Sequence, residues 1–261
     1  MFRIIKNRNA KRKKVDRSRP AIPIFRGEKE RHEKYDISKS SPESDFGRAY
    51  YWGLRFIPAR NWSLSSSDEG YVSWYIFDIQ SALSDMEVQP ECPNDPINWL
   101  DIIIKFKEKR YDGKAQIIMG DMIDGAKGAV LDEYRAKAKM MGITSMLDFP
   151  DSIKQEMIDK LHPDRFDQQV AFRNEKALSY LEHIGTAKVK DMSEWKYSDP
   201  SAIAANVIIM LISQDKIDEY TATKAFLSSN TFRRVIAEPK VAQLPPTTIL
   251  NMYRQEVRNN A

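Results

Sequence analysis

The sequence is poor in cysteine and in long apolar runs, and each shortage excludes a class of protein. Its 261 residues include one cysteine, Cys92, so no intrachain disulfide and no cysteine zinc site can form, which is typical of a reducing compartment. The longest apolar runs, 102–104 and 207–212, are far shorter than a membrane span. Residues 7–14 are polar and basic where a secretory signal would continue as an apolar segment. We expect a protein that is cytoplasmic or lies within a virion, is not secreted and has no membrane partner.

Recognised catalytic and cofactor motifs are missing as well. Gly120, Gly125 and Gly128 do not have the spacing of a phosphate-binding loop, and no Gly-Lys-Ser or Gly-Lys-Thr occurs. Cys92 lies in a Pro-Glu-Cys-Pro turn with no nucleophile motif around it. We therefore expect no enzymatic activity and no cofactor, with a nuclease-type activity left open.

Two sets of residues have the chemical types found in metal or nuclease sites, but neither has a recognised spacing. The sets are His162, Asp164, Asp167 and His183, and Asp101, Glu108 and Lys109. Such residues more often cap helices or face solvent, and carboxylates beside lysines arise by chance when 30% of residues are charged. No metal site is predicted.

What the sequence does have is a segregated charge. The net charge is +4, yet residues 1–35 hold thirteen Lys or Arg against four Asp or Glu, and residues 221–261 hold six against two. The segment between them is therefore acidic. Basic ends that flank an acidic body bear on association with partners rather than on the fold.

The strongest positive charge is a cluster near the N-terminus, in which Asp16 is the one acid. Its seven cations are Arg8, Lys11, Arg12, Lys13, Lys14, Arg17 and Arg19. Such a cluster attracts phosphates by releasing condensed counterions and needs no preformed pocket. Other interpretations are a solvated tail, a nuclear targeting signal, or an arm that docks on the acidic body of a neighbouring copy.

A second candidate is the stretch from Phe46 to Trp62, which is rich in aromatic residues and arginine. Alternation from Tyr50 onward predicts a strand that ends at Pro58. Exposed bases would stack on Tyr50 or Trp52 while arginines hold the backbone. The arginines are Arg48, Arg55 and Arg60. In the alternative interpretation the aromatic residues are core and the arginines are the solvated face of the strand.

The tripeptide His162-Pro163-Asp164, expected between two helices, resembles the loop of J-domain co-chaperones, which stimulate the Hsp70 ATPase. The resemblance covers at most residues 141–184, and the helix before the tripeptide lacks the basic face of J-domains. The alternative is that His-Pro-Asp ends one helix and caps the next.

Apolar spacing predicts helices for most of the chain after Ser67. A helix through 72–86 has a buried strand at 71–79 as its alternative. Further helices are expected, several with clear caps such as Asp95 before Pro96. They cover 95–112, 115–141, 150–161, 167–184, 200–213, 217–237 and 246–259. The pair at 200–213 and 217–237 would also fit a helix-turn-helix, although the first of these helices is apolar nearly all round.

These observations predict a mainly α protein, in the sense of an α-rich α+β fold, with at most a small sheet at its N-terminal side. The expected segments are a basic extended arm and linker at 1–44, an aromatic-rich mixed subdomain at 45–113 and a helical body at 114–261. The leading functional hypothesis is a non-enzymatic nucleic-acid-binding protein, structural or accessory, that grips the backbone with weak sequence specificity and forms an oligomer. A virion, packaging or replication-complex component fits this design. The alternative is a protein-protein assembly subunit whose basic ends dock on acidic surfaces of neighbouring copies.

Overall fold

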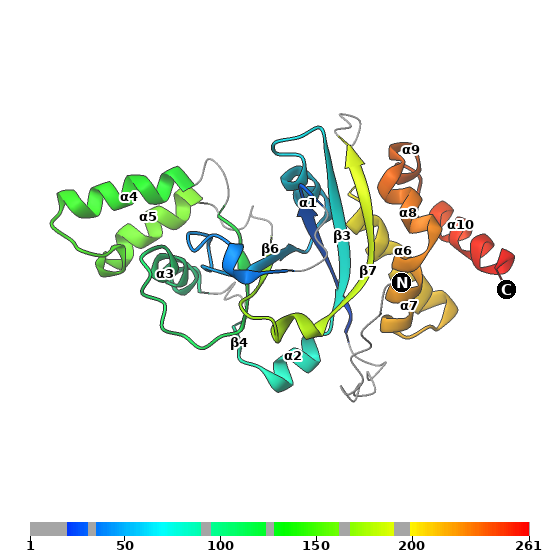
Figure 1. Ribbon diagram of the computed structural model, residues 1–261, viewed down its shortest axis with the longest axis horizontal. Coiled ribbons are helices and arrows are strands. Elements are labelled where there is room, and N and C mark those ends of the chain that lie inside the picture. Colours follow the sequence, from blue (N-terminus) through cyan, green and yellow to red (C-terminus); the bar gives the residue numbers. More distant parts are fainter. Residues whose placement is uncertain are drawn as a thin grey trace, which may run out of the picture.

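The computed structural model describes residues 20–30, 35–89, 95–123, 128–161, 168–190 and 199–260, and it is built around a seven-stranded mixed sheet (Figure 1). The strand order is β4-β5-β6-β2-β1-β3-β7, with β4 and β5 parallel and the other neighbours antiparallel. The strands are β1 Ile22–Glu28, β2 Tyr50–Gly53, β3 Glu69–Phe77, β4 Val88–Gln89, β5 Ile117–Asp121, β6 Gln168–Phe172 and β7 Leu181–Lys190. The prediction of a mainly helical body with a small N-terminal sheet is therefore wrong.

Most of the helices form two large groups, α3–α5 at one end of the molecule and α6–α10 at the other (Figure 1). The helices are α1 Phe56–Ser63, α2 Ile79–Asp85, α3 Pro96–Lys107, α4 Gly128–Met140, α5 Asp151–Leu161, α6 Pro200–Asp215, α7 Glu219–Ser228, α8 Asn230–Ala237, α9 Pro239–Ala242 and α10 Pro246–Asn259. Short 3₁₀ helices occur at η1 Ile37–Lys39, η3 Met146–Asp148 and η5 Ala177–Tyr180. The predicted helices at 95–112, 150–161, 200–213 and 246–259 are confirmed in type and position.

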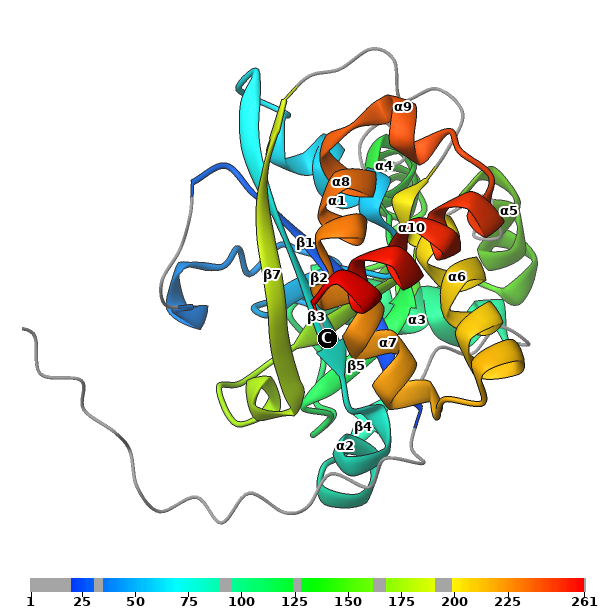
Figure 2. The same cartoon turned by 90° about the vertical axis from the view of Figure 1, so that its right-hand side faces the viewer.

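One face of the sheet packs against both large groups of helices. Phe25 of β1 and Trp74 of β3 are buried in a core with α1 and α6–α10, and the Trp74 indole donates to the Leu227 carbonyl oxygen at 3.0 Å. Ala171 of β6 and Ile118 of β5 belong to a second core with α3–α5. Seen from the α10 end, the helices lie to one side of the long β3–β7 pair (Figure 2).

The opposite face of the sheet carries a third core with much less helix over it. Alternate residues of the same strands contribute, and α2 and the segments around η1 and η5 pack beside them. Its fully buried members include Ile24, Trp52, Phe77, Val170 and Phe172. The candidate site described below lies on this face.

The burial of β3 explains why its sequence was read as a helix. The six residues from Val72 to Phe77 are all buried. Helices cover one face of the strand, and the third core covers the other. A strand buried on both faces loses the apolar and polar alternation and is hard to distinguish from a buried helix by periodicity. The alternative of a strand at 71–79 was correct.

Two glycines, Gly120 and Gly185, allow close packing in the sheet where helices were expected. The predicted helix over 167–184 is replaced by β6, η5 and β7, and Gly185 lies inside β7. A Cβ at Gly185 would be 2.4 Å from Cζ2 of Trp74, so β7 passes directly over the indole. The predicted helix over 115–141 is likewise β5, where Gly120 meets Phe46, followed by α4.

Part of the segment expected as an arm and linker at 1–44 belongs to the sheet. Residues 22–28 form β1, which pairs with β3 over its whole length. α1 packs on β1 so closely that a Cβ at Gly27 would lie 1.8 Å from the Ala59 carbonyl oxygen. Strands from all three predicted segments thus share a single sheet.

Candidate functional site

A cluster of charged and aromatic side chains lies on the less covered face of the sheet, around Arg26 of β1. The Arg26 Nε donates to Glu28 Oε1 at 3.2 Å, and Nη1 donates to the Tyr51 carbonyl oxygen at 3.1 Å. The guanidinium carbon also lies near three ring centroids, at 4.9 Å from Tyr35, 5.0 Å from Trp52 and 5.8 Å from Tyr50. Aromatic faces attract a guanidinium, which keeps its charge in such surroundings.

Glu28 is the buried anion of this cluster, with 2% of its side chain exposed against 21% for Arg26. It also accepts a hydrogen bond from the Tyr35 hydroxyl at 2.9 Å, and that hydroxyl lies 2.6 Å from the Tyr75 hydroxyl. A buried carboxylate is tolerated when it is paired and hydrogen-bonded. Burial raises the pKa of Tyr35 and of Tyr75 above the ordinary phenol value, so both stay protonated at neutral pH.

Two polar atoms of the cluster have no hydrogen-bond partner among the residues that the structure describes. They are the Tyr50 hydroxyl and the Trp52 Nε1, and both are buried. The Tyr35 ring contacts both aromatic systems, with centroid distances of 5.4 Å to Tyr50 and 5.6 Å to Trp52. Buried polar atoms are usually satisfied, so an unpaired donor beside an arginine indicates a place for a ligand or a water molecule.

The cluster continues across the sheet toward β7. The Ser73 hydroxyl lies 2.9 Å from the Thr186 hydroxyl, which in turn lies 3.0 Å from His183 Nε2. The His183 ring is also 5.0 Å from the ring of Tyr75. Residues of β1, β2, β3 and β7 therefore combine one guanidinium, one buried carboxylate and several hydroxyl groups on one face of the sheet.

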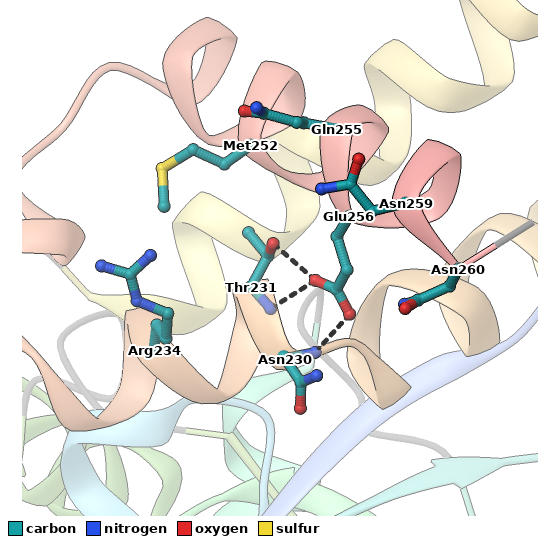
Figure 3. Close-up of a pocket in the computed structure, with 8 residues that line it drawn as sticks. All are labelled: Asn230, Thr231, Arg234, Met252, Gln255, Glu256, Asn259 and Asn260. Carbon is teal, nitrogen blue, oxygen red and sulfur yellow. Dashed lines mark hydrogen bonds between the residues drawn. The ribbon is translucent and has the colours of Figure 1, made fainter.

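A hollow of about 350 Å³ lies elsewhere, between α8 and α10 (Figure 3). Glu256 of α10 points at the start of α8 and accepts from the backbone N–H of Asn230 at 2.8 Å, from that of Thr231 at 2.8 Å, and from the Thr231 hydroxyl at 2.7 Å. Arg234, also on its rim, pairs with Glu238. Glu256 therefore links α10 to α8, Arg234 is paired four residues along its own chain segment, and we do not assign this hollow a ligand.

Residues 22–183 match the model of a protein family described as a protein of unknown function, DUF3990. This match covers more than half of the chain. The chain belongs to the DUF3990 family. No curated protein and no solved structure matches it. The DUF3990 region contains the residues of the Arg26 cluster except Thr186. The cationic N-terminal segment and α6–α10 lie outside the region.

The sequence-predicted residues fall into two groups with respect to the structure. The arm cations all lie outside the described residues: Arg8, Lys11, Arg12, Lys13, Lys14, Arg17 and Arg19. The others lie in the DUF3990 region, and the structure does not bring them together into one surface. Arg48 donates to the carbonyl oxygens of Ser38 and Ser40, Arg55 pairs with Asp199 at 3.2 Å, and Arg60 is buried and donates to the Lys190 carbonyl oxygen.

Trp52 is a core residue rather than a stacking platform. It is 1% exposed and makes edge-to-face contacts with Tyr35, Tyr50, Tyr75 and Phe172. A base has no free face of this ring on which to stack, and Tyr50 is 4% exposed. The alternative interpretation, that the aromatic residues of this strand are core, is the one that the structure favours. The predicted strand was expected to end at Pro58, but β2 ends at Gly53 and Pro58 lies within α1.

Three further sequence hypotheses meet the structure as follows. His162-Pro163-Asp164 lies outside the described residues, but the next described element is the strand β6 and not a helix, so the J-domain resemblance fails. α6 and α7 pack on the core beside β7, and Lys224 of α7 pairs with Glu182 of β7. Among described residues, no three His, Cys, Asp or Glu gather as a metal site, and no helix is long and apolar enough to span a membrane.

Sequence reasoning missed the Arg26 cluster because residues 22–28 were assigned to the arm. The available signal was the segment Ile-Pro-Ile-Phe-Arg-Gly-Glu, in which Ile24, Arg26 and Glu28 alternate and share one face of a strand. Arg26 and Glu28 have opposite charges and share a strand face with the apolar Ile24. This arrangement indicates an arginine that is paired and partly buried.

Proposed function

We propose that this DUF3990 protein is a non-enzymatic nucleic-acid-binding protein, structural or accessory, that contacts the phosphate backbone through its N-terminal cations. The observation that carries the proposal is the density of charge at residues 8–19, where seven cations accompany one acid. Each phosphate neutralised by such a cation releases condensed counterion, which favours binding without a preformed pocket. A setting in a virion, a packaging apparatus or a replication complex suits this design.

The charge distribution of the body supports the assignment of binding to the N-terminal segment. Many lysines and arginines of the described residues form ion pairs with carboxylates of the body itself, which reduces their use for phosphates. Examples are Lys107 with Asp45, Lys154 with Asp101, Lys160 with Glu133, Lys224 with Glu182 and Arg254 with Asp215.

The test compares the full chain with a variant that lacks residues 1–19, using fluorescence anisotropy with labelled single-stranded and duplex oligonucleotides at several salt concentrations. Deletion should lower affinity for every sequence alike and flatten the dependence on salt. Size-exclusion chromatography of the nuclease-treated full chain shows whether it oligomerises without nucleic acid. If deletion leaves affinity unchanged and dissolves an oligomer, the protein is an assembly subunit and the proposal is wrong.

A second candidate function, the binding of a small acceptor-rich anion, rests on a separate observation in the Arg26 cluster. A guanidinium lies beside two buried polar atoms, the Tyr50 hydroxyl and the Trp52 Nε1, that lack partners among the described residues. A ligand that reaches these atoms has to displace the ring of Tyr35, which contacts both. Arginine and an indole N–H both donate hydrogen bonds, so a phosphate or carboxylate group is the complementary chemistry.

This second candidate is tested by the thermal stability of the full chain with inorganic phosphate and with mononucleotides. A ligand that binds the native state raises Tm as its concentration rises. The matched control is the double variant Arg26→Gln, Glu28→Gln, which removes the cation without leaving a buried unpaired carboxylate. An equal rise of Tm in both proteins would place the binding elsewhere.

A further inference from the structure

Among the tryptophans that the structure describes, Trp62 differs from the others in its exposure. Trp52, Trp74 and Trp99 are at most 5% exposed, whereas 60% of Trp62 is exposed. Trp62 lies in the last turn of α1, within the aromatic and arginine-rich stretch of the sequence. An exposed indole presents a large aromatic surface with which the π-face of a base can make a stacking contact.

The position of Trp62 is set by tight packing of α1 on the sheet. Gly27 of β1 approaches the Ala59 carbonyl oxygen, and Gly70 of β3 approaches Ser63, the residue after Trp62. The indole therefore projects from a rigid element. Lys29, the residue that follows β1, places its ammonium 5.7 Å from the Trp62 ring centroid.

The charges at this end of the sheet are mixed. Tyr71 of β3 is in register with Glu28 and Lys188, which brings the β7 lysines to the same end as Lys29. Lys188 and Lys190 both pair with Glu69, and Asp68 is exposed beside it. These β3 and β7 side chains lie on the face of the sheet opposite α1, whereas Lys29 places a cation at the Trp62 ring itself. A cation beside an aromatic face suits a stacked base together with its phosphate.

We propose that Trp62 is the platform on which the protein stacks an unpaired base of single-stranded nucleic acid, an inference that rests on the proposed nucleic-acid-binding function. The N-terminal cations hold phosphates, and Trp62 adds a contact that duplex cannot make because its bases are already stacked. Stacking of a base on an aromatic side chain is tolerant of sequence, in line with backbone-directed binding. Trp62 takes the role that the sequence had suggested for the buried Trp52.

The experiment measures the affinity of full-length Trp62→Ala, Trp62→Phe and Met140→Ala for labelled oligothymidylate and for a duplex. Met140 is a matched control, because it is 88% exposed and lies at the end of α4. Trp62→Ala should weaken single-strand binding by about tenfold and duplex binding by less than about twofold, with the salt dependence unchanged. Trp62→Phe should retain most of the affinity, and Met140→Ala all of it. Thermal stability of all variants should match that of the parent, since both side chains are largely exposed.

The outcomes separate this inference from the function on which it rests. Equal affinities of Trp62→Ala and the parent for oligothymidylate, or an equal loss on single strand and duplex, would overturn the stacking role. If the deletion of residues 1–19 still flattens the salt dependence, the proposed function stands without it. A parent protein that binds neither oligonucleotide contradicts both.

Discussion

Glu256 links α10 to the start of α8, and its removal should destabilise the fold measurably. The first N–H groups of a helix lack partners within the helix. In α8, Ser229 accepts from the N–H of Phe232, and Glu256 accepts from those of Asn230 and Thr231, so the first turn is satisfied by two side chains. Loss of a capping side chain costs about 0.5–2 kcal/mol. Because Glu256 also accepts from the Thr231 hydroxyl, we expect Glu256→Ala to lower the free energy of unfolding by about 1–2 kcal/mol.

The pH dependence of this contribution follows from the pKa of Glu256. Burial raises that pKa, but the hydrogen bonds from Thr231 and Asn230 together bring it below its ordinary value. A carboxyl whose pKa is lowered in the folded state stabilises the fold fully above its unfolded-state pKa of about 4.3, and the contribution is lost as pH falls through the folded-state pKa. The stability difference between the parent and Glu256→Ala should therefore be constant near neutral pH and should shrink in acid.

Urea unfolding at neutral pH and at acid pH measures this difference, with Gln255→Ala as the control at the neighbouring exposed position of α10. Glu256→Gln should retain part of the stability, because one oxygen acceptor remains. The reasoning is refuted if Glu256→Ala is as stable as Gln255→Ala at neutral pH. It is equally refuted if the difference persists unchanged in acid.

Two further substitutions test the packing of the sheet. Gly27→Ala should prevent folding or lower stability by several kcal/mol, because its Cβ would overlap the backbone of Ala59; circular dichroism and urea unfolding check this, and parent-like stability would contradict the close approach. Trp52→Ala should lower stability by about 3–5 kcal/mol, because the ring is buried among four aromatic side chains. A stable Trp52→Ala protein that has lost only nucleic-acid binding would contradict its assignment to the core.

The parts of the fold that the sequence predicted are those with local signals. Asp95 accepts from the N–H of Asn98 and Pro96 begins α3, as the capping pattern indicated. β3 and β7 have no such local signal, because their pairing joins residues more than a hundred positions apart. β3 is buried on both faces, which only the tertiary structure decides, whereas β7 is an edge strand whose residues are mostly partly exposed.

The candidate sites illustrate the same limit. Exposure separates Trp62 from Trp52, yet both are tryptophans beside arginines in one short stretch of sequence. Burial of Trp52 depends on Tyr75 and Phe172, which are contributed by other strands. The Arg26 cluster likewise depends on Tyr35 and Tyr75, so its assembly could not be deduced from the local sequence around Arg26.

The salt dependence of nucleic-acid binding tests the central claim most directly. Each phosphate contact contributes a slope of about −0.7 to −0.9 in a plot of log affinity against log salt. If the seven cations at 8–19 all contact phosphates, the slope of the full chain should be more negative by about 5 to 6 than the slope of the chain without residues 1–19. Identical slopes and affinities for the two proteins would contradict the account.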